Sequence, residues 1–202
     1  IPAEYMFILG PRTYGSPVIA GGRVYVGSTT PGLAHHVGPA PPGLGKSGGC
    51  LFCFSERDGQ LLWTLPLAKL PSRKSHHSDC GYGICSTPTV EGDRVYILSS
   101  RGEVLCLDAK GMADGNDGPF QDEGAFMAGM DERGQANPPL PVDARHGDVI
   151  WCLDLIEQVR TRPHDASSSS VLSHGDYLYV GTGNGINERE NQVPSPLAPS
   201  LV

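Results

Sequence analysis

The sequence predicts an all-β fold assembled from repeated antiparallel hairpins. Residues 86–108 read STPTVEGDRVYILSSRGEVLCLD and contain two runs of β-branched and aromatic residues, each bounded by Gly, Asp or Ser. Such runs separated by short turn segments are the signature of a β-hairpin. Neighbouring positions within each run are apolar, which predicts strands that are buried on both faces. The 27 glycines and 18 prolines among 202 residues are typical of a chain with many short strands.

The same unit occurs three times along the chain. Tyr25, Tyr96 and Tyr179 occupy equivalent positions in the second strand of each copy, within VYV, VYI and LYV. Trp63 and Trp151 occupy equivalent positions in a later strand, within LLW and VIW. A four-stranded unit that is closed by a Trp-bearing outer strand and repeated along a chain is typical of β-propeller blades.

The repeat predicts two complete blades, part of a third and long loop insertions. A propeller closes with about four to eight blades, so we expect an incomplete ring and a sequence that is a piece of a longer protein. The expected segments are a preceding strand at 1–14, blade one at 15–63, blade two at 86–153 and the start of blade three at 168–202.

The repeats resemble those of the pyrroloquinoline-quinone-like (PQQ-like) β-propeller family. The shared pattern is S-P-x-V-x-x-G/D-x-V-Y-V, then G-x-L/V-x-C/A-L/F-D, then G-x-x-x-W, and it extends from about residue 15 to residue 202. Segments 102–124, 168–185 and 193–202 are similar to large bacterial propellers of unassigned function. The family name describes the repeat, and a fold by itself does not define a function.

Composition and charge argue against two classes of partner. The formal net charge is −7, with 15 Lys and Arg against 22 Asp and Glu, and the longest basic run is Arg73-Lys74. This balance argues against nucleic-acid binding. The chain also contains no apolar stretch long enough to span a bilayer as a helix.

Two loop segments carry candidate metal ligands. His76, His77 and Asp79 form a dense cluster of imidazole and carboxylate groups, the ligand types that zinc prefers, although exposed histidines of this kind are more commonly ordinary loop residues. Asp114 and Asn116 fit the first and third positions of a calcium loop. The rest of that template fails, because Gly, Pro and Ala stand where its later residues belong, so an Asx-turn is the alternative.

The six cysteines are expected to be mainly structural. Cys50 and Cys53 have the spacing of a zinc or redox site, but positions three apart in a strand point to opposite faces. We therefore expect them to act as small buried hydrophobic residues. Cys80 and Cys85 flank a short loop and could form a local disulfide in an oxidising compartment.

The resemblance raises the question of a quinone cofactor. The resemblance to quinoprotein dehydrogenases implies a cofactor that lies between a Trp and a disulfide of two adjacent cysteines. It also implies a bound calcium ion and a catalytic Asp. This sequence has no Cys-Cys pair, and the repeat accounts for both of its Trp residues. PQQ or calcium remains possible in the full protein, but no residue of this sequence supports either, and none is assigned as catalytic.

Two functions follow as hypotheses. We expect a non-catalytic propeller that serves as a binding or assembly platform in the periplasm or cell envelope of a bacterium. Its partners would be the remaining blades of the same protein or other protein subunits. The alternative is a quinoprotein oxidoreductase whose cofactor site lies largely in the missing blades.

Loop lengths predict which end of the blades binds a partner. Connections 29–49, 66–85, 157–167 and 185–199 are expected at one end, and insertion 111–147 at the other, with one or two helical turns within 120–130. Long polar loops on a rigid scaffold commonly carry binding sites. His76, His77 and Asp79 are therefore the first residues to substitute in a test of partner binding. The alternative is that these loops serve only to cover neighbouring blades.

Overall fold

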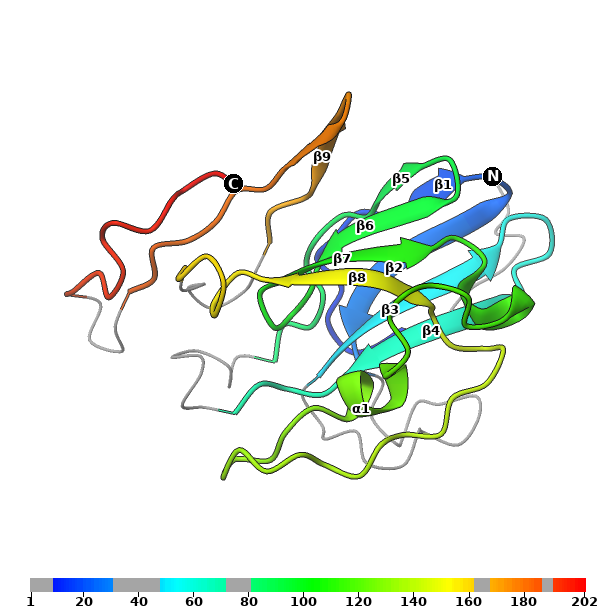
Figure 1. The fold of residues 1–202 in the computed structure, drawn as a ribbon. Helices are drawn as coiled ribbons and strands as arrows, with labels where there is room; N and C mark the ends of the chain where they lie inside the picture. The colour runs from blue at the N-terminus through cyan, green and yellow to red at the C-terminus, as the bar shows by residue number, and fades with distance from the viewer. Residues whose placement is uncertain (1–8, 31–47, 72–80, 162–167, 187–190) are drawn as a thin grey trace.

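The computed structural model describes residues 9–30, 48–71, 81–161, 168–186 and 191–202 (Figure 1). Two four-stranded antiparallel sheets form most of it, each with its strands in sequence order. The first sheet contains β1 (Val18–Ala20), β2 (Arg23–Thr29), β3 (Gly49–Ser55) and β4 (Leu61–Leu67). The second contains β5 (Thr89–Glu91), β6 (Arg94–Leu98), β7 (Glu103–Asp108) and β8 (Val149–Asp154). The predicted all-β class and the four-stranded units are confirmed.

Tight glycine turns begin each sheet. Gly21 and Gly22 join β1 to β2 with φ angles of 57° and 75°, a region that glycine enters without steric cost. Gly92 plays the same part between β5 and β6 with a φ of 58°. These turns set the register, so that Ile19 pairs with Val24 and Val90 pairs with Val95.

The main hydrophobic core lies between the two sheets. Within the runs for which the sequence predicts burial on both faces, Ile97, Leu105 and Leu107 are fully buried in this core, whereas Tyr96 is only partly buried. Strand β7 is buried on both faces, as the sequence predicts, and the equivalent strand β3 is buried in the same way. Cys53 packs into the core between the sheets, and Cys50 joins a separate cluster with Phe52 and Phe54. The two thiols therefore diverge, which rules out a shared metal or disulfide for this pair.

A tryptophan joins the first sheet to the second. Trp63 of β4 donates a hydrogen bond from Nε1 to the carbonyl oxygen of Ala109 at 3.1 Å. The hydroxyl of Tyr25 donates to the same oxygen at 3.3 Å. Gly111 lies under the indole ring, and a Cβ built on it would come within 2.8 Å of that ring. Its φ of 60° and this close approach both require glycine there.

The third unit is a short hairpin beside the second sheet. It comprises β9 (Leu172–His174) and β10 (Tyr177–Tyr179), and Gly181 forms an isolated bridge with Leu201. The backbone N–H of Ser16 donates to the hydroxyl of Thr87, and the N–H of Thr87 donates to that of Ser170. The first strands of the three units, β1, β5 and β9, are therefore joined in the same way at each step.

The long insertion between β7 and β8 follows an unexpected path. It begins with a 3-10 turn, η2 (Gly111–Asp114), and then reaches helix α1 (Glu123–Ala128) beside the far end of β4, where Ala68 N–H donates to the Met127 carbonyl oxygen (Figure 1). It returns along the outer edge of β4, where Thr64 forms a parallel bridge with His146. The expectation that 111–147 lies wholly at the opposite end is therefore wrong, because α1 sits beside the β6–β7 turn.

Candidate binding cleft

The structure describes two of the five predicted metal ligands. His76, His77 and Asp79 lie outside the described residues. The carboxylate of Asp114 accepts a hydrogen bond from the Lys110 ammonium at 2.7 Å on the exposed surface, and this pairing lowers the pKa of Asp114. The side-chain amide of Asn116 turns instead to Glu123, so the two predicted calcium ligands have different partners.

A cleft of about 340 Å³ opens where α1 meets the end of β4 and the β6–β7 turn. Its walls combine apolar and aromatic side chains with one buried ion pair. The lining residues are Lys69, Leu70, Pro71, Arg101, Glu103, Ala125, Phe126, Gly129, Met130, Ala136 and Asp154. This is the end at which the sequence predicts a binding face. One wall of the cleft, however, comes from the insertion that was expected at the opposite end.

Arg101 lies at the base of this cleft and is held there by several contacts. Its side chain is 5% exposed, and Nε donates to Oε2 of Glu103 at 2.9 Å. Nη1 donates to the carbonyl oxygen of Phe126 at 2.7 Å, and the guanidinium lies 4.2 Å from the centre of the Phe126 ring. Nη2 has no hydrogen-bond partner although it is buried. The hydroxyl of Ser99 donates to the same Glu103 oxygen at 2.8 Å, which holds the carboxylate in place.

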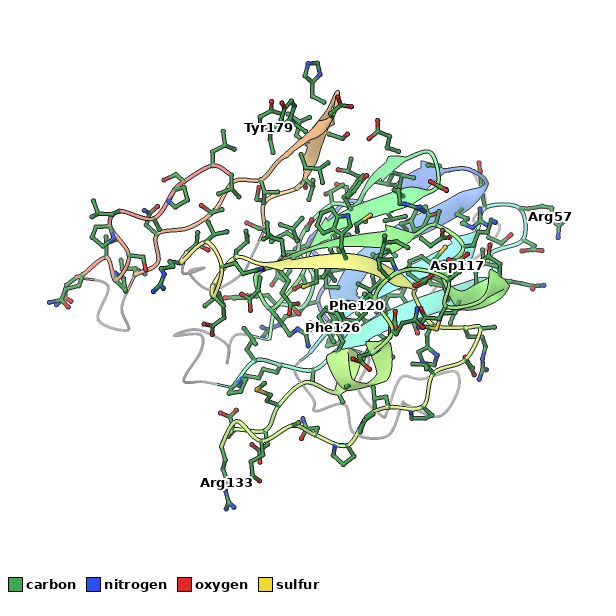
Figure 2. The ribbon with its side chains drawn as sticks, in the orientation of Figure 1. Arg57, Asp117, Phe120, Phe126, Arg133 and Tyr179 are labelled. Carbon is green, nitrogen blue, oxygen red and sulfur yellow. The ribbon has the colours of Figure 1, made fainter. Side chains whose placement is uncertain are left out.

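An aromatic pair supports the wall formed by the helix. Phe120 and Phe126 pack edge to face with their ring centres 5.4 Å apart, and Figure 2 shows them together at α1. Arg101 lies against Phe126 as a cation–π contact, so the ion pair and the aromatic pair form one continuous unit. The exposed Met130 side chain completes the rim. The wall that the helix provides is therefore mainly apolar and aromatic.

The described thiols are not activated for nucleophilic chemistry. Burial raises the pKa of both Cys53 and Cys152 to about 12 and that of Cys106 to about 11. Burial also raises the pKa of Cys50 and of Cys85, which is a free buried thiol; its predicted partner Cys80 lies outside the described residues. A thiol with a raised pKa stays protonated at neutral pH and reacts poorly.

The insertion and the start of β8 carry two buried carboxylates. Asp148, just before β8, is completely buried, and burial together with the negative charges of Glu123 and Asp117 raises its pKa to about 6. Glu123, the first residue of α1, is 1% exposed. Within the described ranges, no three His, Cys, Asp or Glu side chains already form a ligand set for a metal ion.

Arg101, Phe126 and Asp148 were not predicted from the sequence. Arg101 stands in the segment SSRG, which reads as an ordinary hairpin turn. Asp148 stands in the segment HGDV before a strand, where an acidic residue is unremarkable. The signal that could have found them is the DGNDGPFQDEG segment, whose acidic and aromatic residues are dense for a loop that only links two strands.

The fold and its repeats define a PQQ-like β-propeller, which confirms the resemblance. Residues 8–114 match the family model described as outer membrane protein assembly factor BamB. This match covers just over half of the chain, which therefore belongs to that family. A comparison with curated proteins gives no significant match.

One similar solved structure is quinohemoprotein alcohol dehydrogenase from Comamonas testosteroni. The two share 13% sequence identity with a TM-score of 0.43, over 87% of this chain and 18% of that one. The chain thus spans less than a fifth of that protein's length. In the part of the chain that the structure describes, no helix is long and apolar enough to cross a membrane.

Proposed function

We propose that this chain is part of a non-catalytic propeller that binds a partner protein through the cleft beside α1. Segments 15–63, 86–153 and 168–202 would be consecutive blades of that propeller. The single observation that carries the proposal is a preformed cleft with an apolar rim and a rigid, buried Arg101 at its base. The family description names an outer membrane protein assembly factor, which supports a place in the bacterial cell envelope.

The occupant that fits this cleft is an extended segment of another protein. Leu70, Phe126 and Met130 offer apolar contact to one anchoring side chain. The unpartnered Nη2 of Arg101 is a donor that a backbone carbonyl of such a segment would satisfy. Aromatic, Met and Arg residues are also the types that are enriched in protein-binding surfaces.

Binding is favoured over catalysis by the state of the polar groups in the cleft. Arg101 and Glu103 form an ion pair, with Nε 2.9 Å from Oε2, and both side chains are largely buried. The described thiols have raised pKa values, as set out above. These groups hold the shape of the cleft, which is what a binding platform requires.

A displayed library of random peptides, selected on the purified protein, tests this proposal. We expect the enriched peptides to share an apolar anchor residue and to bind roughly tenfold more weakly to Met130→Asp, because a charge enters the rim. The matched control is Val142→Asp, another exposed apolar residue of the same insertion that does not line the cleft.

Two results would contradict the proposal. Equal loss of peptide binding in both variants would show that the cleft is not the site, and so would a library without enrichment. A visible absorption band of bound quinone or haem in the purified full-length protein would instead favour the oxidoreductase alternative.

A further inference from the structure

Asp148 is a buried carboxylate without the partners that such a group needs. Its side chain is 0% exposed, and neither carboxylate oxygen has a well-formed hydrogen bond, although the backbone N–H of Asp117 is near enough to act against the rise in its pKa. Its backbone carbonyl accepts a hydrogen bond from Asp108 N–H at 3.0 Å, so the residue is anchored to the end of β7. An isolated ionised carboxylate is costly to bury, because it loses its hydration without gaining a counter-charge.

Glu123, within the insertion, is a second buried carboxylate with an unpartnered oxygen. It is 1% exposed, and its Oε1 has no hydrogen-bond partner. Its Oε2 accepts a hydrogen bond from Nδ2 of Asn116 at 2.6 Å, which joins the start of α1 to the preceding loop. Three carboxylate oxygens of these two residues are therefore buried and unpartnered at the root of the insertion.

The two carboxylates and the 116–118 loop converge at the start of β8. The strongest charges acting on Asp148 are those of Glu123, Asp117 and Asp108, all of which are negative. Gly118 lies against β8, since a Cβ built on it would be 3.6 Å from the carbonyl oxygen of Val149. Figure 2 shows Asp117 at this same end of β8.

We propose that this group of oxygens binds a hard divalent cation, for which Ca²⁺ is the best fit, with Asp148 and Glu123 as its carboxylate ligands. Asp117 and water would supply further oxygens, because both oxygens of Asn116 and the carbonyl oxygen of Gly118 already accept hydrogen bonds from Nε2 of Gln121. Ca²⁺ accepts six to eight oxygen ligands in flexible geometry, including carbonyl oxygens and water, so it does not need a complete set of acidic side chains. The cation would supply the positive charge that the buried pair lacks.

This site differs from the calcium loop that the sequence suggests. Asp114 is excluded, because it is exposed and paired with Lys110. Asn116 positions Glu123 by donating from Nδ2, but its own side-chain oxygen accepts from Gln121, so Asn116 is not a ligand. The decisive residue, Asp148, lies far along the sequence. A cation here would fasten α1 to β8 and thereby hold the wall of the cleft in place.

Terbium luminescence and calcium-dependent melting of the full chain test the inference. Tb³⁺ replaces Ca²⁺ at oxygen sites, and the ring of Trp63 lies against Gly147, the neighbour of Asp148, where it can transfer excitation to the ion. We expect saturable Trp-sensitised emission from one ion per chain that added Ca²⁺ displaces. Ca²⁺ should also raise the melting temperature, because it binds only the folded chain.

Variants separate a built site from a generally acidic loop. Asp148→Asn and Glu123→Gln should weaken Tb³⁺ and Ca²⁺ binding by roughly tenfold or more, because each removes one charged ligand. Asp114→Asn, in the same insertion but paired with Lys110, should bind as the unchanged protein does. Circular dichroism of each variant shows whether the fold is kept, and the near-isosteric Asp148→Asn decides if Glu123→Gln does not fold.

Three outcomes would overturn the inference. The first is a melting temperature that Ca²⁺ does not change at millimolar concentration. The second is equal loss of Tb³⁺ binding in Asp114→Asn and Asp148→Asn, which would indicate only diffuse attraction to acidic residues. The third is a melting temperature that depends on pH but not on any divalent cation, which would mean that a shared proton stabilises the carboxylate pair. Loss of peptide binding to the cleft would not count, because it tests the proposed function.

Discussion

The rings of Tyr96 and Trp151 lie 6.2 Å apart in the second sheet, nearly the 6.0 Å that separates Tyr25 from Trp63 in the first. The environments of the two tryptophans nevertheless differ. Trp63 is 1% exposed and hydrogen-bonded to Ala109, whereas Trp151 is 37% exposed. Among the described residues, no carbonyl oxygen accepts a hydrogen bond from the indole N–H of Trp151, as that of Ala109 does from Trp63. The repeat therefore sets the ring pair, and the neighbouring unit determines its burial.

Truncation of the two tryptophans should have unequal effects on stability. We expect Trp63→Ala to lower the free energy of unfolding by about 3–5 kcal/mol, because it opens a cavity between the sheets. Trp151→Ala should cost about 1–2 kcal/mol, since its ring is already partly in water. Urea denaturation monitored by circular dichroism measures both. Equal losses would contradict the different roles assigned to these residues.

The ion pair of Arg101 and Glu103 should be strongly coupled. Arg101→Met leaves a buried carboxylate without its counter-charge and should cost about 3–5 kcal/mol of unfolding free energy. Adding Glu103→Gln should recover part of this loss, so that the double-mutant cycle gives a coupling of about 1–3 kcal/mol.

The exposed pair of Arg57 and Asp58, with Nη2 3.1 Å from Oδ2, is the control for this cycle. Its coupling should be below about 1 kcal/mol, because solvent screens it. A coupling for Arg101 and Glu103 no larger than that of the control would show that their hydrogen bond contributes little to the cleft.

Asp143 should titrate at unusually low pH. Hydrogen bonds from the side chain and backbone N–H of Arg145 lower the pKa of Asp143 to about 2. Because the folded pKa is below the unfolded value of about 3.9, its stabilising contribution is present above pH ~4 and is lost as the pH falls through about 2. Arg145→Ala should raise the pKa of Asp143 only partly, since the backbone hydrogen bond remains.

An NMR titration of the Asp143 carboxyl carbon measures this shift directly. A pKa for Asp143 that does not change in Arg145→Ala would mean that the backbone amide alone stabilises the carboxylate.

The strands were predictable because their signals are local. The alternation of apolar runs with Gly turns at residues 21–22 and 92 is enough to define β1, β2, β5 and β6, and the hairpin predicted within residues 86–108 is formed by β6 and β7. The opposite orientation of Cys50 and Cys53 follows equally from the two-residue period of a strand.

The cleft and the carboxylate pair were not predictable in the same way. Arg101 contacts Phe126, and the charge of Glu123 acts on Asp148, only because the insertion crosses from one end of the sheets to the other and returns. That path depends on hydrogen bonds between Thr64 and residues 145 and 147, which no local pattern announces. Topology alone assigned the insertion to the wrong end, since a loop that starts at one end need not stay there.

The bridge between Thr64 and His146 has a consequence for biosynthesis. The backbone groups on the outer edge of β4 are paired by a segment that the ribosome makes only after the second sheet has begun, so the first sheet leaves the exit tunnel with that edge open. An open strand edge invites pairing with other chains. The nascent protein therefore passes through an interval in which a chaperone or slow translation would be most useful, and this interval ends when residues 145–147 emerge and dock.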